Sequence, residues 1–160
     1  MDHAPQPPYL QDGPSYWSID YIRAPREVVF DHLTTGEHTK RYYYGMPIND
    51  PREVGQAVWF GPTEEASPIR GKVLAYDRPS RFSHTFAFGH RDDAPSVVDF
   101  VLDQAGPAIT KLTLHHHGFD GRTGTYIDVA EGWPAILASL KSLLETGEPL
   151  DWPQPEGNDV

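Results

Sequence analysis

The sequence predicts an α+β fold, in which a curved antiparallel sheet of about six strands wraps on a long C-terminal helix. Near the C-terminus, Ile136, Leu137, Leu140, Leu143 and Leu144 recur at the three-and-four spacing of one helical face. Upstream, successive segments alternate apolar and polar residues with a period of two, and short turns join them. Because strands and helices occur in separate runs, the order favours α+β over alternating βαβ units.

The first strand is predicted to begin near residue 15. Trp17, Ile19 and Tyr21 alternate there with Ser18 and Asp20. A residue period of two places the three apolar side chains on one face of a strand.

Two short helices are predicted to follow this strand. Pro25 occupies a plausible first helical position, and Val29, Phe30 and Leu33 form an apolar patch behind it. The second helix or turn is expected between residues 34 and 44, and it ends in a run of three tyrosines before a glycine.

The middle of the chain is predicted to be a meander of strands. The expected strands cover residues 54–61, 69–76 and 81–88, a segment through Val98, Phe100 and Leu102, and a segment from Thr110 to His116. The sequence Asp77–Arg78–Pro79 predicts a turn between two of them.

The C-terminal helix is predicted over residues 132–147. Gly147 suits a left-handed C-terminal cap, and Pro149 prevents continuation. Pro134 has two interpretations: it begins the regular helix, or it kinks a longer helix that starts near Thr125. In both cases a bend near Trp133 could open the mouth of a cavity.

Composition excludes several classes of function. The net charge of -10, from 13 basic and 23 acidic residues, opposes binding to nucleic acid and to anionic membranes. The absence of cysteine excludes disulfides and thiolate metal sites. With no long apolar run and no apparent signal peptide, we expect a cytoplasmic protein without membrane insertion.

Four segments together resemble the START-like, or SRPBCC, superfamily: IDYIRAPREVVFDHLT, GKVLAYDRPSRFSHTF, TKLTLHHHGF and GWPAILASLKSLLETG. They are most similar to the branch named after the activator of heat shock protein 90 ATPase. The resemblance covers about residues 16–150. It implies a helix-grip fold with a largely apolar cavity between the sheet and the C-terminal helix. We expect one domain over residues 15–147 with flexible tails at 1–14 and 148–160, since the first of these segments is polar and rich in Pro and Gly.

The candidate ligand-binding residues are those expected to line this cavity. They are Trp59, His84, Phe86, Phe100, Leu112, His116, Trp133, Leu137 and Leu140. The same aromatic residues would equally suit a filled core.

The polar candidates also have alternatives. His116 shares its face with Leu112 and Leu114, so it is either a polar group in the cavity or a hydrogen-bonded core histidine. His84, in line with Phe82 and Phe86, has the same two interpretations. Asp99 is either exposed or an acid in the pocket.

No metal or cofactor is expected. His115 and His117 could share an ion on one strand face, but no third ligand appears at a recognisable spacing. Solvent-facing or hydrogen-bonded imidazoles are therefore preferred there.

The leading hypothesis is binding of a small hydrophobic or aromatic molecule, lipid- or polyketide-like, without turnover. The alternative is a cyclase, aromatase or hydrolytic enzyme, with His116, Asp99 and one of residues 42–44 as acid and base. A co-chaperone that stimulates a chaperone ATPase ranks third. Exposed aromatic residues and the Pro-rich tails could also mediate a homodimer.

Overall fold

A computed structural model describes residues 13–151 of the chain. Its elements are β1 (Tyr16–Ile22), α1 (Arg26–Thr34), α2 (Gly36–Tyr42), β2 (Ala57–Phe60), β3 (Ile69–Asp77), β4 (Arg81–Phe88), β5 (Ser96–Gly106), β6 (Ile109–His117) and α3 (Gly124–Thr146). The six strands form one antiparallel sheet in the order β1-β6-β5-β4-β3-β2. The predicted α+β helix-grip architecture is confirmed.

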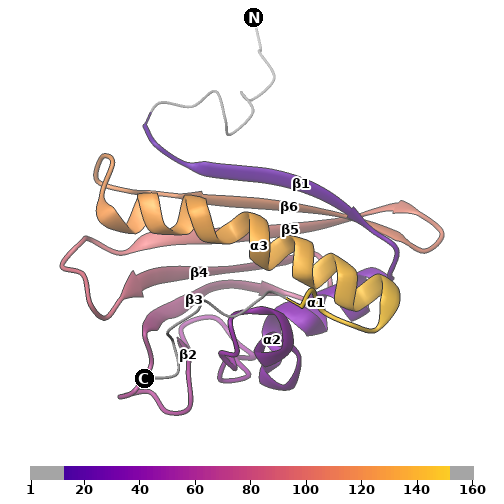
Figure 1. Cartoon of the computed structure of the whole chain (residues 1–160), viewed down its shortest axis with the longest axis horizontal. Helices are drawn as coiled ribbons and strands as arrows, with labels where there is room; N and C mark the ends of the chain where they lie inside the picture. Colours follow the sequence, from indigo (N-terminus) through magenta and orange to yellow (C-terminus); the bar gives the residue numbers. More distant parts are fainter. Residues whose placement is uncertain (1–12, 152–160) are drawn as a thin grey trace, which may run out of the picture.

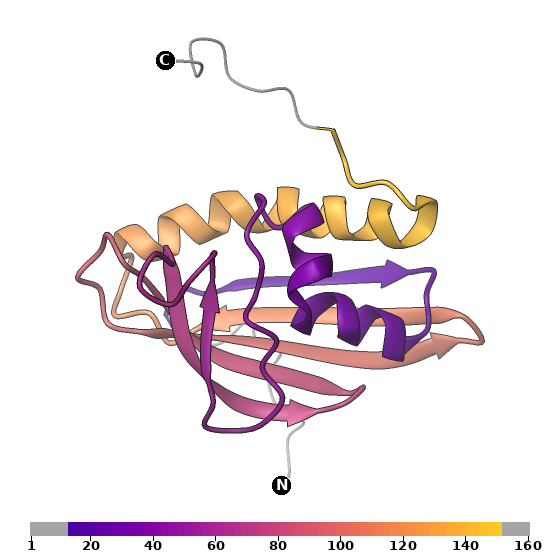
Figure 2. The same ribbon diagram turned by 90° about the horizontal axis from the view of Figure 1, so that it is seen from below.

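All three helices lie on one side of the curved sheet. Figure 1 shows α3 crossing the strands, and Figure 2 shows α1 and α2 on that side of the sheet as well. The core between these layers is apolar and contains the fully buried Phe30, Phe82, Phe86 and Leu140. The helices thus share one face of the sheet and leave the other without a helix among the described residues.

The inner face of the central strands follows the predicted alternation. Phe82, His84 and Phe86 of β4 are buried, and so are Val98, Phe100 and Leu102 of β5. Leu112, Leu114 and His116 continue the same layer on β6, because Phe100 pairs with Leu114 and Val98 with His116.

Strand β1 presents its apolar alternation to the outer face of the sheet. In the register with β6, Ser18 pairs with the buried Leu114, and Ile22 pairs with the buried Thr110. Ile19 and Tyr21 point the other way and are exposed. The side of β1 that faces α3 is therefore its more polar one.

The strand predicted over residues 54–61 is shorter than expected, since β2 begins at Ala57. Gly55 has a φ of 89°, a backbone conformation that suits glycine, and its N–H donates to the carbonyl of Val73. Residues 53–56 therefore form a turn that leads into the strand.

The helix boundaries correct one prediction and settle one alternative. Pro25 is the N-cap residue of α1 and not its first helical residue, and its carbonyl accepts from the N–H groups of Val28 and Val29. Helix α3 is the longer of the two helices considered, because it begins at Gly124 and contains Pro134.

Both ends of α3 carry the caps that the chemistry of a helix terminus requires. The side chain of Thr123 accepts from the N–H of Tyr126. Gly147 has a φ of 85°, and its N–H donates to the carbonyl of Leu143. These caps define a helix of 23 residues that spans the sheet.

Helix α3 also contacts the end of the edge strand β1. Lys141 donates to the carbonyl of Tyr21, and Glu145 accepts from the N–H of Arg23 just beyond the strand. Lys141 and Glu145 form an ion pair with each other. The last backbone groups of this edge are therefore bonded to side chains of the helix.

Most of the two predicted tails lies outside the described residues. Only 13–14 and 148–151 are described, and Leu150 donates its N–H to the hydroxyl of Ser139 on α3. The helices within residues 13–151 are all too short or too polar to cross a membrane.

Candidate functional site

The space between the sheet and α3 contains two neighbouring hollows. The larger one, the outer cleft, has a volume of about 100 Å³ and lies at the N-terminal half of α3. It is lined by Tyr43, Tyr44, Met46, Ile69, Phe86, Phe88, Asp128, Val129, Gly132, Trp133 and Ile136. Its wall is almost entirely apolar, as a site for an apolar molecule requires.

The smaller hollow, the inner cavity, has a volume of about 10 Å³ and lies deeper in the core. It is lined by Leu33, Tyr42, Tyr43, Phe60, Phe82, His84, Phe100, Trp133, Ile136, Leu137 and Leu140. This volume is close to the minimum that one water molecule needs, so the aromatic rings fill nearly all of the interior.

Tyr43, Trp133 and Ile136 line both hollows and so separate them. The rings of Tyr43 and Trp133 meet edge to face, with centroids 5.8 Å apart, and Tyr43 also stacks on Phe60 at 4.6 Å. These ring contacts, together with Ile136, form the partition between the inner cavity and the outer cleft.

Trp133 is held by a chain of hydrogen bonds that runs through His116. Its indole N–H donates to Nδ1 of His116 over 3.0 Å, and Nε2 of His116 lies 2.7 Å from the hydroxyl of Ser96. Because an indole N–H only donates, Nδ1 is the acceptor and Nε2 carries the proton. The hydroxyl of Ser96 in turn donates a hydrogen bond to the carbonyl of Phe86.

Both ring nitrogens of His116 are therefore occupied, and the side chain is fully buried. Burial lowers the pKa of this imidazole well below its ordinary value, with the nearby His84 as a lesser cause. His116 is a neutral core histidine that joins α3 to the sheet, which is the second of the two interpretations that the sequence allowed.

His84 lies in the wall of the inner cavity between two phenylalanine rings. Its ring centroid is 5.3 Å from that of Phe82 and 5.9 Å from that of Phe60. Nδ1 lies 2.8 Å from the carbonyl of Thr85 and must donate to it. Burial lowers the pKa of His84 to about 4, against a smaller opposite effect of the Thr85 bond, so the ring is neutral near pH 7.

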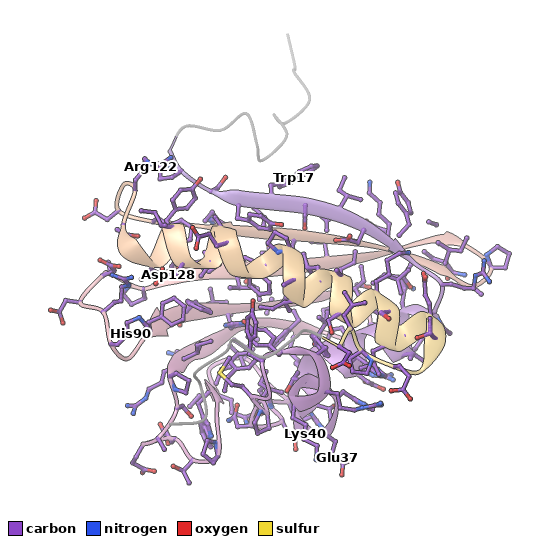
Figure 3. All side chains as sticks on the ribbon, in the orientation of Figure 1. Trp17, Glu37, Lys40, His90, Arg122 and Asp128 are labelled. Carbon is purple, nitrogen blue, oxygen red and sulfur yellow. The ribbon has the colours of Figure 1, made fainter. Side chains whose placement is uncertain are left out.

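The loop between β4 and β5 fixes the rim of the outer cleft. Arg91 donates to Asp128 over 2.7 Å, and His90 lies 4.0 Å from the same carboxylate. Figure 3 shows His90 and Asp128 at this end of α3. Asp93 accepts from both the N–H and the hydroxyl of Thr125, which holds the pKa of Asp93 below its usual range.

The structure distributes the predicted site residues over four places. The inner cavity is lined by His84, Phe100, Trp133, Leu137 and Leu140, and the outer cleft by Phe86 and Trp133. Two further candidates, Leu112 and His116, are buried but line neither hollow. Trp59 lies on the outer face of the sheet, away from both hollows. Trp59 is wrong as a cavity residue because its neighbours Val58 and Phe60 are the buried residues of β2, and alternation turns Trp59 away.

Other polar candidates lie away from the cavity. Asp99 is on the outer face in a two-pronged ion pair with Arg81, so it is not an acid in the pocket. His115 and His117 stack on that face with centroids 4.3 Å apart. No group of three metal-ligating side chains occurs within residues 13–151.

The sequence missed the part of the cleft that comes from loops and strand ends. Met46 follows α2 without any periodic pattern, and Ile69 and Phe88 lie at the ends of β3 and β4. Phe88 shares the parity of Phe82 and Phe86, which is a signal that could have included it.

A six-stranded antiparallel sheet that grips a long C-terminal helix, with an apolar cleft between them, defines a helix-grip protein of the START-like class. The family model described as "Activator of Hsp90 ATPase homolog 1-like protein" matches residues 23–145. The chain belongs to this family. No protein among the curated sequences matches it.

Several solved structures have the same fold. Protein MLL2253 from Mesorhizobium loti is 25% identical over 81% of this chain and 96% of its own, with a TM-score of 0.69. The Aha1 dimer from Colwellia psychrerythraea is 20% identical over 83% and 97%, with a TM-score of 0.68. CalU16 from Micromonospora echinospora is 19% identical over 85% and 76%, with a TM-score of 0.65.

Proposed function

We propose that the protein binds a small hydrophobic or aromatic molecule between the sheet and α3, without turnover. The observation that supports this proposal best is the outer cleft, a hollow of about 100 Å³ with an almost wholly apolar wall beside Trp133. Burial of an apolar ligand there removes its surface from water, at about 25 cal/mol per Å².

The size of the cleft limits what enters without rearrangement. An apolar cavity of about 150 Å³ holds benzene, so the outer cleft suits part of a single ring. A larger lipid- or polyketide-like ligand requires Tyr43 and Tyr44 to move. Tyr44 has an exposed fraction of 61% and a φ of 51°, and its hydroxyl has only a long 3.4 Å contact with the carbonyl of Gly132.

Binding is preferred over catalysis because three of the candidate acid and base groups, His116, Asp99 and Tyr42, are engaged elsewhere. Both nitrogens of His116 are bonded, and Asp99 is paired with Arg81 on the other face. The hydroxyl of Tyr42 donates to the carbonyl of His32 over 2.6 Å. A cyclase, aromatase or hydrolase that used His116, Asp99 or Tyr42 would have to break one of these contacts.

The proposal is tested by thermal unfolding with toluene as the probe. We expect toluene to raise the melting temperature, because a ligand that binds only the folded state stabilises it by mass action. The substitution Val129→Trp fills the outer cleft and should abolish the increase. The matched control is Ile127→Trp, on the same helix at a residue with 44% exposure. This control variant should show the same increase in melting temperature with toluene as the wild type.

An unchanged melting temperature of the wild-type protein at saturating toluene would contradict the proposal. An equal response in the Val129→Trp variant would place the binding elsewhere. Chaperone ATPase stimulation without any response to apolar compounds would favour the co-chaperone alternative that the family description suggests. A homodimer is a further prediction, supported by the dimeric protein from Colwellia psychrerythraea.

A further inference from the structure

Four side chains in the wall of the inner cavity carry polar atoms: Tyr42, Tyr43, His84 and Trp133. Tyr42 donates to the carbonyl of His32, and the indole N–H of Trp133 donates to His116. Within residues 13–151, Nε2 of His84 and the hydroxyl of Tyr43 have no hydrogen-bond partner. They are the two groups of this wall that a ligand can engage without breaking a bond.

The two groups differ in how firmly they are held. His84 is fixed by the bond from its Nδ1 to the backbone of Thr85 and by the rings of Phe60 and Phe82. The side chain of Tyr43, the C-cap residue of α2, is held by ring contacts and by no hydrogen bond of the described residues. His84 is therefore the preorganised group, and Tyr43 the movable one.

The chemistry of Nε2 follows from the bond at Nδ1. A neutral imidazole has one N–H, and the Thr85 carbonyl requires it at Nδ1, so Nε2 presents a lone pair. Burial keeps the ring neutral, since it lowers the pKa of His84 to about 4. The inner cavity thus offers a fixed hydrogen-bond acceptor in a small hollow that is lined mostly by aromatic and aliphatic side chains.

From this geometry we infer the class of ligand: a small aromatic molecule with a hydroxyl group, whose O–H donates to Nε2 of His84 while its ring lies in the outer cleft and in the passage that opens when the ring of Tyr43 rotates. This inference rests on the proposed function. The inner cavity, at about 10 Å³, has room for a group the size of one water molecule, which matches a hydroxyl.

The ligand would enter from the outer cleft past Tyr43. Trp133 is the fixed side of the passage, because its N–H is bonded to His116 and its ring also meets Phe100 edge to face at 5.9 Å. Tyr43 is followed by Tyr44 and Gly45, both with left-handed backbone conformations, in the segment that leaves α2. Rotation of the Tyr43 ring connects the two hollows without breaking a hydrogen bond of the described residues.

The test compares 4-methylphenol with p-xylene. The two molecules have nearly the same shape, and p-xylene carries a methyl group where 4-methylphenol carries its hydroxyl. Their dissociation constants are measured by calorimetry for the wild type and for three variants: His84→Phe, His84→Gln and His117→Phe. Phenylalanine removes the acceptor, glutamine keeps an acceptor near the position of Nε2, and His117 lies outside the cavity on the outer face.

We expect the wild type to prefer 4-methylphenol, and His84→Phe to reduce that preference by about 2- to 13-fold, since a buried hydrogen bond contributes about 0.5–1.5 kcal/mol. His84→Gln and His117→Phe should retain most of the preference. In the wild type, the ¹⁵N resonance of His84 Nε2 should shift with 4-methylphenol and not with p-xylene.

Three results would overturn the inference, and they differ in what they say of the proposed function. If both compounds bind and His84→Phe leaves their ratio unchanged, the cleft binds aromatic molecules but His84 does not select them. If neither compound binds the wild type, the inference and the proposed function both fail. A Nε2 resonance that ignores 4-methylphenol at saturation also counts against the inference.

Discussion

The buried neutral histidine of the inner cavity predicts a specific dependence of stability on pH. In the unfolded chain His84 has an ordinary pKa near 6.5, whereas burial in the folded state lowers it to about 4. When the pH falls below 6.5, the unfolded state therefore takes up a proton that the folded state does not. The stabilisation is present above about pH 6.5 and is lost as the pH falls toward 4.

The two pKa values give the size of the effect. Between about pH 7 and pH 5, proton uptake by the unfolded state lowers the free energy of unfolding by about 2 kcal/mol through His84 alone. His116 acts in the same direction, because burial lowers its pKa as well.

The substitution His84→Gln isolates this contribution, since His116 and all carboxylates are common to both proteins. Urea unfolding followed by circular dichroism at the two pH values gives four free energies of unfolding. We expect the variant to lose about 2 kcal/mol less than the wild type on acidification. Equal losses in both proteins would refute the reasoning, because they would mean that His84 takes up its proton equally in the folded and unfolded states.

Three substitutions in α3 test its packing and its hydrogen-bond chain. Leu140→Ala should lower the free energy of unfolding by about 2–5 kcal/mol, because Leu140 is fully buried, while Ile127→Ala on the exposed side should change it by less than about 0.5 kcal/mol. Trp133→Phe keeps a ring but leaves Nδ1 of His116 without its donor, at an expected cost of about 1–3 kcal/mol in the same urea experiment. A loss at Ile127 equal to that at Leu140, or no loss at Trp133, would contradict these assignments.

The side chains buried on the central strands could be predicted because alternation is a local property. His84, Phe86 and Phe100 share parity with obvious apolar neighbours, and each is buried as that parity requires. The same rule cannot tell which parity is the inner one where both contain large residues. Trp59 of β2 shows this limit.

The alternation of β1 also fails to indicate which of its faces is buried. Its apolar residues alternate clearly, yet Ile19 and Tyr21 are exposed because pairing with β6 aligns Ser18 with the buried Leu114. Register is a long-range property of two strands, and it decides which face of an alternating segment is inside.

The candidate site could be predicted only where it is built from regular elements. Trp133 was expected near a cavity mouth, and it separates the two hollows. The opposite wall, with Tyr43 and Met46, comes from the segment after α2, where no periodicity indicates which side chains point inward. The hydrogen-bond chain from Trp133 to Ser96 joins residues 37 positions apart, and no local pattern indicates it.

The contacts between α3 and the end of β1 have a consequence for association of the protein with itself. An edge strand offers free N–H and C=O groups to which another strand can add, and such addition is a route to aggregation. Here the carbonyl of Tyr21 is bonded to Lys141 and the N–H of Arg23 to Glu145. Lys141 and Glu145 of α3 thereby block the addition of another strand at this end of the sheet edge. The helix that covers the core thus also protects the protein against aggregation through strand addition.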